Sequence, residues 1–268
     1  MMLMLINHMA TLACALLGLW GLSRLYDPAG GAKKKYFWAI YGVTFFLAAA
    51  GDPFIWYIAG LPFLAAGALV AWKGRYWRPW WLALVVTLAA GLAAKALVLG
   101  LQHEGFQTIN FESSFLGYVV SGRRLPFNFY QDGRSVLLLF GWPLAQPSGL
   151  EEFFAVIRTL IGIAAVVATL MLVRQPASES SDYYLDYALL LGILFNHASF
   201  IASNLPVNDA TTRYLLPSFI YVTILAARRC GPLLSKRWAE AAGWARPLTL
   251  TALVGIAACA FSPLWTMA

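Results

Sequence analysis

The sequence predicts an all-α fold: a polytopic transmembrane helix bundle of about eight spans with an extracytoplasmic interfacial helix, forming one domain over residues 1–268. The side chains are 60% hydrophobic and 12% charged, which leaves too little polar surface for a water-soluble fold of this size. Apolar runs recur along the chain, and roughly 20 apolar helical residues cross a hydrocarbon core about 30 Å thick. Lysine and arginine gather in alternate loops, as they do in polytopic membrane proteins.

The apolar runs give the spans in chain order. They cover residues 3–22, 37–50, 54–72, 79–101, 151–173, 184–203, 214–227 and 247–267. The first run starts at Met1 with neither a basic leader region nor a clear cleavage site. It is therefore either a helix from the middle of a larger bundle or a short first helix oriented by the lysines that follow it. Residues 102–150 form the one long non-spanning segment, expected to be interfacial or re-entrant.

The distribution of basic residues predicts the orientation of the spans. Of the nineteen lysines and arginines, thirteen fall in one set of alternate loops, four in the opposite set and two within spans. The richer set faces the cytoplasm in most membrane proteins, so both termini are predicted to be extracytoplasmic. We expect an integral protein of a bacterial plasma (inner) membrane. The net charge of +7 is spread over short loops in this arrangement, which argues against a nucleic-acid partner.

The cysteines do not indicate a covalent or metal framework. Cys14, Cys230 and Cys259 have no paired spacing, so neither a disulfide set nor a zinc site is predicted. Motifs of zinc, nucleotide and triad enzymes are absent as well. A divalent cation held by Asp52, Asp209 and a histidine is conceivable, but no spacing indicates it. We therefore expect no cofactor.

The orientation gathers the polar candidates at the outer side of the bundle. His8, His103 and His197 all fall there, as does Asp52 in the short turn "GDPF". The second span has only about 14 apolar residues and rises about 21 Å, so Asp52 is expected below the outer headgroups. A carboxylate at that depth is a functional candidate, and Asp52 is the tentative catalytic residue. The alternative is a turn former between two helices.

The segment 102–150 contains two further patterns. In "FESSFLGYVVSG", residues 111–122, apolar side chains share one helical face, which predicts the interfacial helix. In "GRRLPFNFYQDGR", the basic residues Arg123, Arg124 and Arg134 surround Asp132 on the side where such residues are scarce. They either bind an anionic ligand such as a lipid phosphate or form ion pairs with Glu104, Glu112 and Asp132. The following run, residues 135–150, is interrupted by glycine and proline and is expected to be re-entrant.

A polar island lies between the sixth and seventh spans. In "NLPVNDATTRYLLP", residues 204–217, Asp209 is placed to cap the next helix. Arg213 stands one turn inside that helix, where its guanidinium can bind a phosphate in bidentate fashion, and Tyr214 would lie at headgroup level. We therefore count Arg213, Tyr214, Asp209, His8 and His197 with the three outer arginines as candidate substrate-binding residues.

The run Asp209-x-x-x-Arg213-Tyr214-Leu215-Leu216-Pro217 resembles the Arg-Tyr-x-x-Pro region of the GT-C superfamily of polytopic glycosyltransferases. The start "NHMATLACALLGL" and the "GDPF" hairpin are similar to the middle part of such proteins. The resemblance implies a polyprenyl-phosphate-linked sugar as substrate, with Arg213 at the lipid phosphate and Tyr214 in the same pocket.

The chain departs from that superfamily at its first outer loop. The resemblance implies an acidic catalytic residue in a loop after the first helix, whereas here the first outer turn is Gly51-Asp52-Pro53. Either Asp52 takes that role, or the catalytic part is absent or supplied by another chain. The alternative function is a non-catalytic membrane subunit that packs in a larger complex, consistent with the 40 aromatic residues, 15% of the chain.

Overall fold

A computed structural model of the protein describes 2–26, 34–74, 76–106, 122–140, 180–203, 206 and 209–240, with scattered helical residues between 156 and 171. Within these parts every regular element is helical. The predicted all-α class therefore holds for the described chain. The predicted interfacial helix at residues 111–122 lies outside the described residues except for its last residue, and the eighth span lies wholly outside them.

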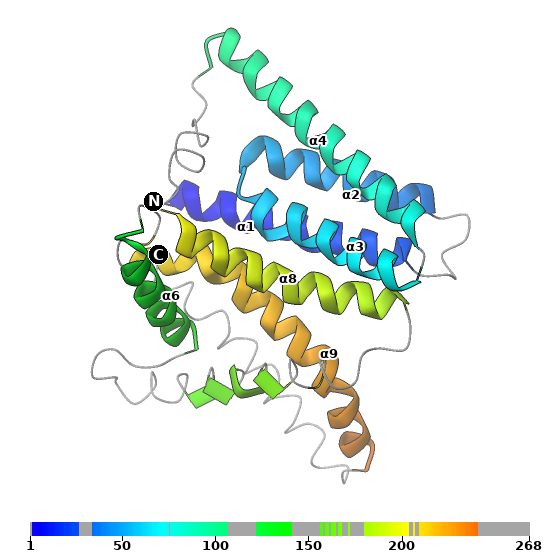
Figure 1. Ribbon diagram of the computed structural model, residues 1–268, viewed down its shortest axis with the longest axis vertical. Coiled ribbons are helices and arrows are strands. Elements are labelled where there is room, and N and C mark those ends of the chain that lie inside the picture. Colours follow the sequence, from blue (N-terminus) through cyan, green and yellow to red (C-terminus); the bar gives the residue numbers. More distant parts are fainter. Residues whose placement is uncertain are drawn as a thin grey trace.

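Antiparallel neighbours form the centre of the bundle. The helices α1 (Met2–Leu25), α2 (Lys34–Gly51), α3 (Leu61–Gly74) and α8 (Ser180–Ala202) lie side by side in Figure 1. A short π-helix, η2 (Trp56–Gly60), leads directly into α3. The helix α9 (Leu216–Glu240) follows the 3-10 segment η3 (Asp209–Leu215) and packs along α8.

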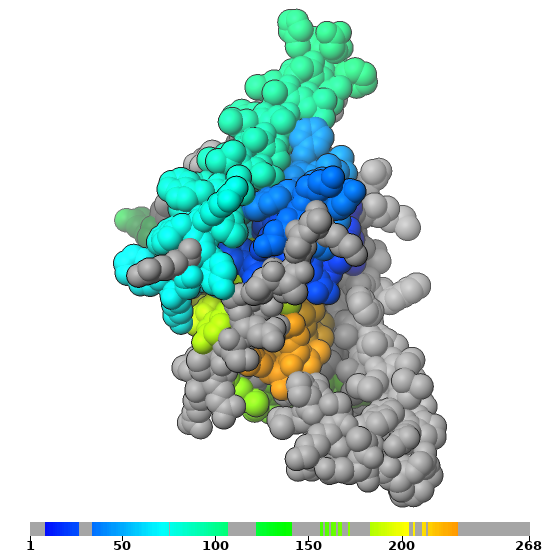
Figure 2. Space-filling model, turned by 90° about the vertical axis from the view of Figure 1, so that its right-hand side faces the viewer, coloured from blue at the N-terminus to red at the C-terminus, as the bar shows by residue number. Residues whose placement is uncertain are grey.

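The helix α4 (Trp77–His103) packs on α2 and α3 at the edge of the bundle. Figure 2 shows its C-terminal end projecting beyond the neighbouring helices. It ends in a Schellman arrangement: the N–H of Phe106 donates to Leu101 O at 3.0 Å, and that of Gly105 to Gln102 O at 3.0 Å. Gly105 adopts a φ of +85°, which glycine takes without steric cost.

Aromatic rings fill the core, and the hydroxyls of Tyr221 and Tyr41 form hydrogen bonds there. Tyr26 and Tyr184 stack at a centroid distance of 4.3 Å between α1 and α8. Tyr221 of α9 is fully buried and donates to Ile58 O at 2.9 Å, and Tyr41 bonds to Thr87 of α4. These hydroxyls need partners because an unpaired polar group away from water is costly.

An ion pair joins α8 and α9 at the end opposite the Asp52 turn. Asp186 is 1% exposed. Its carboxylate accepts from Arg228 Nε at 3.2 Å and from Arg229 Nη2. The apolar run ends at residue 227, which predicts both arginines in a cytoplasmic loop, but α9 continues to Glu240. The pairing with Asp186 explains the difference, because it stabilises helical turns beyond the apolar run.

Three described helical segments are long and apolar enough to cross a membrane. They are Trp56–Gly74, Trp77–His103 and Tyr183–Ala202. The stretch Met9–Leu25 of α1 is apolar but shorter. Six of the eight predicted spans correspond to described helices, and the described residues of the fifth are helical too. By length and composition, three of these described helices could cross a membrane.

One prediction concerns the contact between α8 and α9. A Cβ at Gly192 would lie 2.5 Å from Cε2 of Tyr221, so Gly192→Ala forces this ring away from Ile58 O. We expect the free energy of unfolding to fall by about 1–3 kcal/mol, the usual cost of overpacking, measured by thermal unfolding in detergent.

The matched control is Gly100→Ala on α4, where an added Cβ meets nothing within 4 Å. This change should leave stability unchanged or raise it by up to about 1 kcal/mol. Equal effects of the two substitutions would contradict the close contact between α8 and α9.

Candidate functional site

A polar helix packs across the end of the bundle that carries the Asp52 turn. This helix, α6 (Leu125–Leu139), begins with Pro126 at N1 or N2, a position that tolerates a missing N–H. Its buried residues are Asn128, Gln131, Ser135 and Leu139. They follow a spacing of three and four residues, so they share one face, and three of the four are polar. The helix contacts α8 and η3.

Asn128 fixes α6 to the end of α8. Its Nδ2 donates to Ile201 O at 2.7 Å and to Ser203 O at 2.8 Å. Carbonyls at the C-terminal end of a helix have no partner within that helix. Asn128 of α6 supplies the hydrogen-bond donors that these carbonyls of α8 need. The side chain is 1% exposed, and water cannot replace it there.

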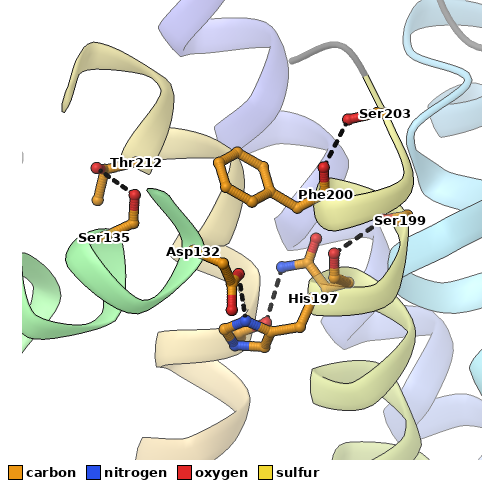
Figure 3. A network of polar contacts seen from close by, with 9 residues as sticks. Asp132, Ser135, His197, Ser199, Phe200, Ser203 and Thr212 are labelled. Atoms are coloured by element: carbon orange, nitrogen blue, oxygen red, sulfur yellow. Dashed lines mark hydrogen bonds and ion pairs between the residues drawn. The ribbon is translucent and has the colours of Figure 1, made fainter. Parts of the chain in front are cut away.

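Asp132 lies one turn after Asn128 on α6. It contacts His197, which lies one turn before Ile201 on α8. Asp132 Oδ1 lies 2.8 Å from His197 Nδ1, and the two side chains are 15% and 23% exposed. Figure 3 shows the carboxylate of α6 pointing at the imidazole of α8. An ionised carboxylate only accepts hydrogen bonds, so in the neutral imidazole the proton is on Nδ1 and the lone pair on Nε2. A base oriented by a carboxylate results, the arrangement found in many acyl-transfer sites.

Hydroxyl and amide groups surround this pair. Thr212 Oγ1 of η3 donates to Ser135 Oγ at 2.9 Å, and Asn196 Nδ2 of α8 donates to Ser218 Oγ of α9 at 2.8 Å. Two buried carbonyl oxygens, Gln131 Oε1 and Asn196 Oδ1, have no hydrogen-bond partner in the described structure. Both are acceptors, and a buried acceptor of this kind can take a hydrogen bond from a ligand.

Asp52 lies elsewhere at the same end of the bundle and serves the turn. It is 3% exposed. Its Oδ1 accepts the N–H of Phe54 at 3.0 Å, and its Oδ2 accepts from Thr11 Oγ1 of α1 at 3.2 Å. A carboxylate that bonds the backbone two residues on is a turn former. The geometry therefore supports the structural alternative for Asp52 over the catalytic one.

Tyr214 packs inside the bundle next to this turn. Its ring meets that of Phe54 edge to face at 6.1 Å, and it packs against two apolar clusters, the large central one and a smaller one that contains Leu139 and Phe200. The side chain is half-buried. Tyr214 therefore connects the Asp52 turn with η3.

The predicted arginine cluster is spread along α6. Arg123 and Arg124 are exposed just before the helix, whereas Arg134 is half-buried ten residues later. That spacing is about 15 Å along a helix axis. The described contact of Asp132 is to His197, from a different helix. The three arginines thus do not enclose Asp132 as one group.

The start of the predicted re-entrant run is also different. Residues 135–139 continue α6 instead of beginning a separate segment, because Ser135 shares the buried face of Asn128 and Gln131. Residues 141–150 of the run lie outside the described residues. Sequence reasoning missed Asn128, Gln131, Ser135, Asn196 and Thr212 as members of the site. Their only signal was the spacing of the first three.

The structure describes the backbone but not the side chains of His8, Asp209 and Arg213. Their predicted roles therefore stay predictions. Among the side chains that are described, no group of three or more His, Cys, Asp or Glu residues could hold a metal ion. Asp209 is not among those side chains, so the conceivable cation at Asp52 and Asp209 stays a prediction as well.

Comparison of the chain with protein-family models, curated proteins and solved structures finds no match in any of the three.

The contact of Asn128 with α8 gives a second prediction. Asn128→Ala removes two donors and leaves the carbonyls of Ile201 and Ser203 buried without them, at a cost of about 1–3 kcal/mol. We expect the backbone amides of α6 to exchange hydrogen roughly 5- to 150-fold faster, measured by mass spectrometry on the protein in lipid nanodiscs.

Phe129→Ala is the matched control, because this neighbouring side chain is 60% exposed and bonds nothing on α8. It should leave the exchange of α6 within twofold (about 0.4 kcal/mol) of the unchanged protein. Slow exchange in both variants would show that Asn128 does not hold α6 in place.

Proposed function

We propose that the chain is a GT-C-like membrane glycosyltransferase module that handles a polyprenyl-phosphate-linked sugar at the extracytoplasmic face. The proposal includes the finer topology expected from the sequence: about eight spans, both termini outside, and a bacterial inner membrane. The three helices able to cross a membrane support an integral membrane protein. The arrangement of charge supports the orientation, since Arg24, Lys34 and Lys73 lie at the helix ends opposite α6.

The observation that carries the proposed activity is the pair of Asp132 and His197. A transferase of this kind needs a base to remove a proton from the acceptor hydroxyl. His197 Nε2 has the lone pair for this step, and Asp132 stabilises the imidazolium that forms. Both side chains are partly exposed, so an acceptor hydroxyl can approach them. The pair takes over the role that the resemblance assigns to an acidic first loop.

The proposed reaction transfers the sugar from the polyprenyl phosphate to the acceptor hydroxyl. His197 takes the proton of the acceptor hydroxyl while the acceptor oxygen forms a bond to the anomeric carbon of the sugar. The bond from that carbon to the phosphate oxygen breaks, and the polyprenyl phosphate leaves with the electron pair. Arg213, Arg123 and Arg124 are proposed to bind this phosphate, because guanidinium groups stabilise the negative charge that develops on it.

The unpaired acceptors near the pair support a hydroxyl-bearing ligand. Gln131 Oε1 and Asn196 Oδ1 are buried and lack donors among the described residues. Sugar hydroxyls are donors and would complete these bonds. A phosphate has only acceptor oxygens when fully ionised, and the carboxylate of Asp132 repels it. The sugar is thus proposed to lie at α6 and α8, with the phosphate at the arginines.

One observation favours the second candidate, a non-catalytic subunit of a larger membrane complex. Only Ala83, Thr87 and Ala94 of the 27-residue α4 are buried, and the exposed residues include Leu92 at 69%. A partner membrane protein could cover this surface, although lipid chains suit it equally well.

The third prediction tests the base. Purified protein in nanodiscs is given polyprenyl phosphoglucose or polyprenyl phosphomannose with glycerol as acceptor, and release of free polyprenyl phosphate is measured. We expect Asp132→Asn and His197→Gln each to slow release about 10²- to 10⁴-fold. Binding of polyprenyl phosphate should change less than about twofold, because neither group contacts it in the proposed arrangement.

Two controls accompany this experiment. Ser199→Ala removes a hydroxyl of α8 that donates only to its own helix at Asn196 O, and should leave the rate unchanged. Asp52→Asn keeps an oxygen for the Phe54 N–H and should also retain the rate. Loss of release in Asp52→Asn alone would return the catalytic role to Asp52. A protein that releases nothing with either donor but copurifies with a second membrane chain would favour the subunit function.

A further inference from the structure

The helix α6 has its polar and apolar faces reversed relative to a helix on a water-soluble protein. Its buried face carries Asn128, Gln131 and Ser135, whereas large apolar side chains point away from the bundle. The exposed apolar residues of α6 are Leu125 (37%), Phe127 (44%), Phe129 (60%), Tyr130 (61%) and Leu137 (45%). A helix surrounded by water buries its apolar face instead. The surroundings of α6 are therefore expected to be apolar.

The contacts of α6 give its depth relative to the membrane-crossing segment of α8. That segment ends at Ala202, and His197 lies five residues before it, about 7.5 Å along the helix. Asp132 is 2.8 Å from His197, so the middle of α6 lies inside the end of the segment. Leu139 packs in the same cluster as Phe200 of α8 and Phe219 of α9. The C-terminal end of α6 therefore lies at about the same depth as Phe200 and Phe219.

The start of α6 lies at the end of α8, nearer to the membrane surface than the middle of α6. Asn128 contacts the carbonyls of Ile201 and Ser203, at the very end of α8. Arg123 and Arg124 come a further turn before Asn128 and are exposed. They therefore lie at or beyond the end of the membrane-crossing segment, where lipid phosphates are found. Arginines at headgroup level, followed by apolar side chains, are typical of helices that insert into one leaflet.

From this placement we infer that α6 is seated in the lipid leaflet at its end of the bundle. Acyl chains cover Phe129, Tyr130 and Leu137, and Arg123 and Arg124 lie at the level of the lipid headgroups. The helix has 15 residues, about 22 Å, so it enters the leaflet without crossing the bilayer. The occupant of its outward face is the bilayer, not water or another protein. This inference needs no catalytic activity and holds whichever of the two functions is correct.

The seating has a consequence for the polar residues behind α6. Asp132 belongs to α6 and His197 contacts it, so the pair lies within about one helix diameter, about 10 Å, of the outward face of α6. An amphiphilic molecule could then reach the pair by moving along the leaflet and past α6. It would not have to leave the membrane first.

The fourth prediction tests the seating with an environment-sensitive probe. The three native cysteines are replaced by alanine, and a single cysteine at Phe129 or Leu137 is labelled with a nitrobenzoxadiazole fluorophore. The protein is placed in phosphatidylcholine vesicles that contain a doxyl-labelled phosphatidylcholine as quencher. We expect both positions to lose at least half of their fluorescence to the lipid quencher and less than a tenth to aqueous iodide.

Two reference positions on α4 calibrate the measurement. Leu92 is 69% exposed in the middle of a membrane-crossing segment, and a label there reports contact with lipid. Phe106 is 63% exposed beyond the end of that segment, and a label there reports contact with water. Labels at Phe129 and Leu137 should match the first reference.

Two other results would overturn the inference. Quenching by iodide at both positions would mean that the outward face of α6 contacts water. Protection from both quenchers would mean that protein covers it. Because the two labelled side chains point away from the bundle, their replacement should preserve the fold, and retained binding of Asn128 to α8 is checked by hydrogen exchange of α6.

Discussion

A polar group placed where water is scarce needs a partner from within the protein, and this requirement organises the end of the bundle around α6. The last carbonyls of α8 have no partner in their own helix. Asn128 supplies two donors to them. By holding α6 against α8 at this point, Asn128 also sets the distance at which Asp132 meets His197 one turn away. The site therefore depends on a contact that takes no part in its chemistry.

The same requirement accounts for polar contacts through the rest of the bundle. Tyr221 and Tyr184 donate to the backbone carbonyls of Ile58 in η2 and Phe63 in α3. At the opposite end, the buried carboxylate of Asp186 is compensated by two arginines of α9. A carboxylate left alone at that position would be strongly unfavourable. Each of these bonds ties helices that are far apart in the sequence, so the polar groups help to specify which helices are neighbours.

The reversed faces of α6 join the two proposals. A helix with lipid on one side and a base oriented by a carboxylate on the other can present a membrane-bound substrate to a polar site. The acceptors left unpaired beside the pair, Gln131 Oε1 and Asn196 Oδ1, suit the hydroxyls of such a substrate. Buried polar groups without partners are uncommon in folded proteins, and a ligand that supplies donors is one physical reason for them.

The sequence by itself determined the helical class, the approximate bounds of six helices and the gathering of Asp132 and His197 at one end of the bundle, because long apolar runs and alternating basic loops are local patterns. It did not identify α6, whose buried face is polar and whose glycine and proline residues suggest a loop. Only the tertiary structure decided that Asp132 pairs with His197 and that Asp52 serves its turn. Those choices depend on contacts between helices 65 and 41 residues apart, and no local pattern contains them.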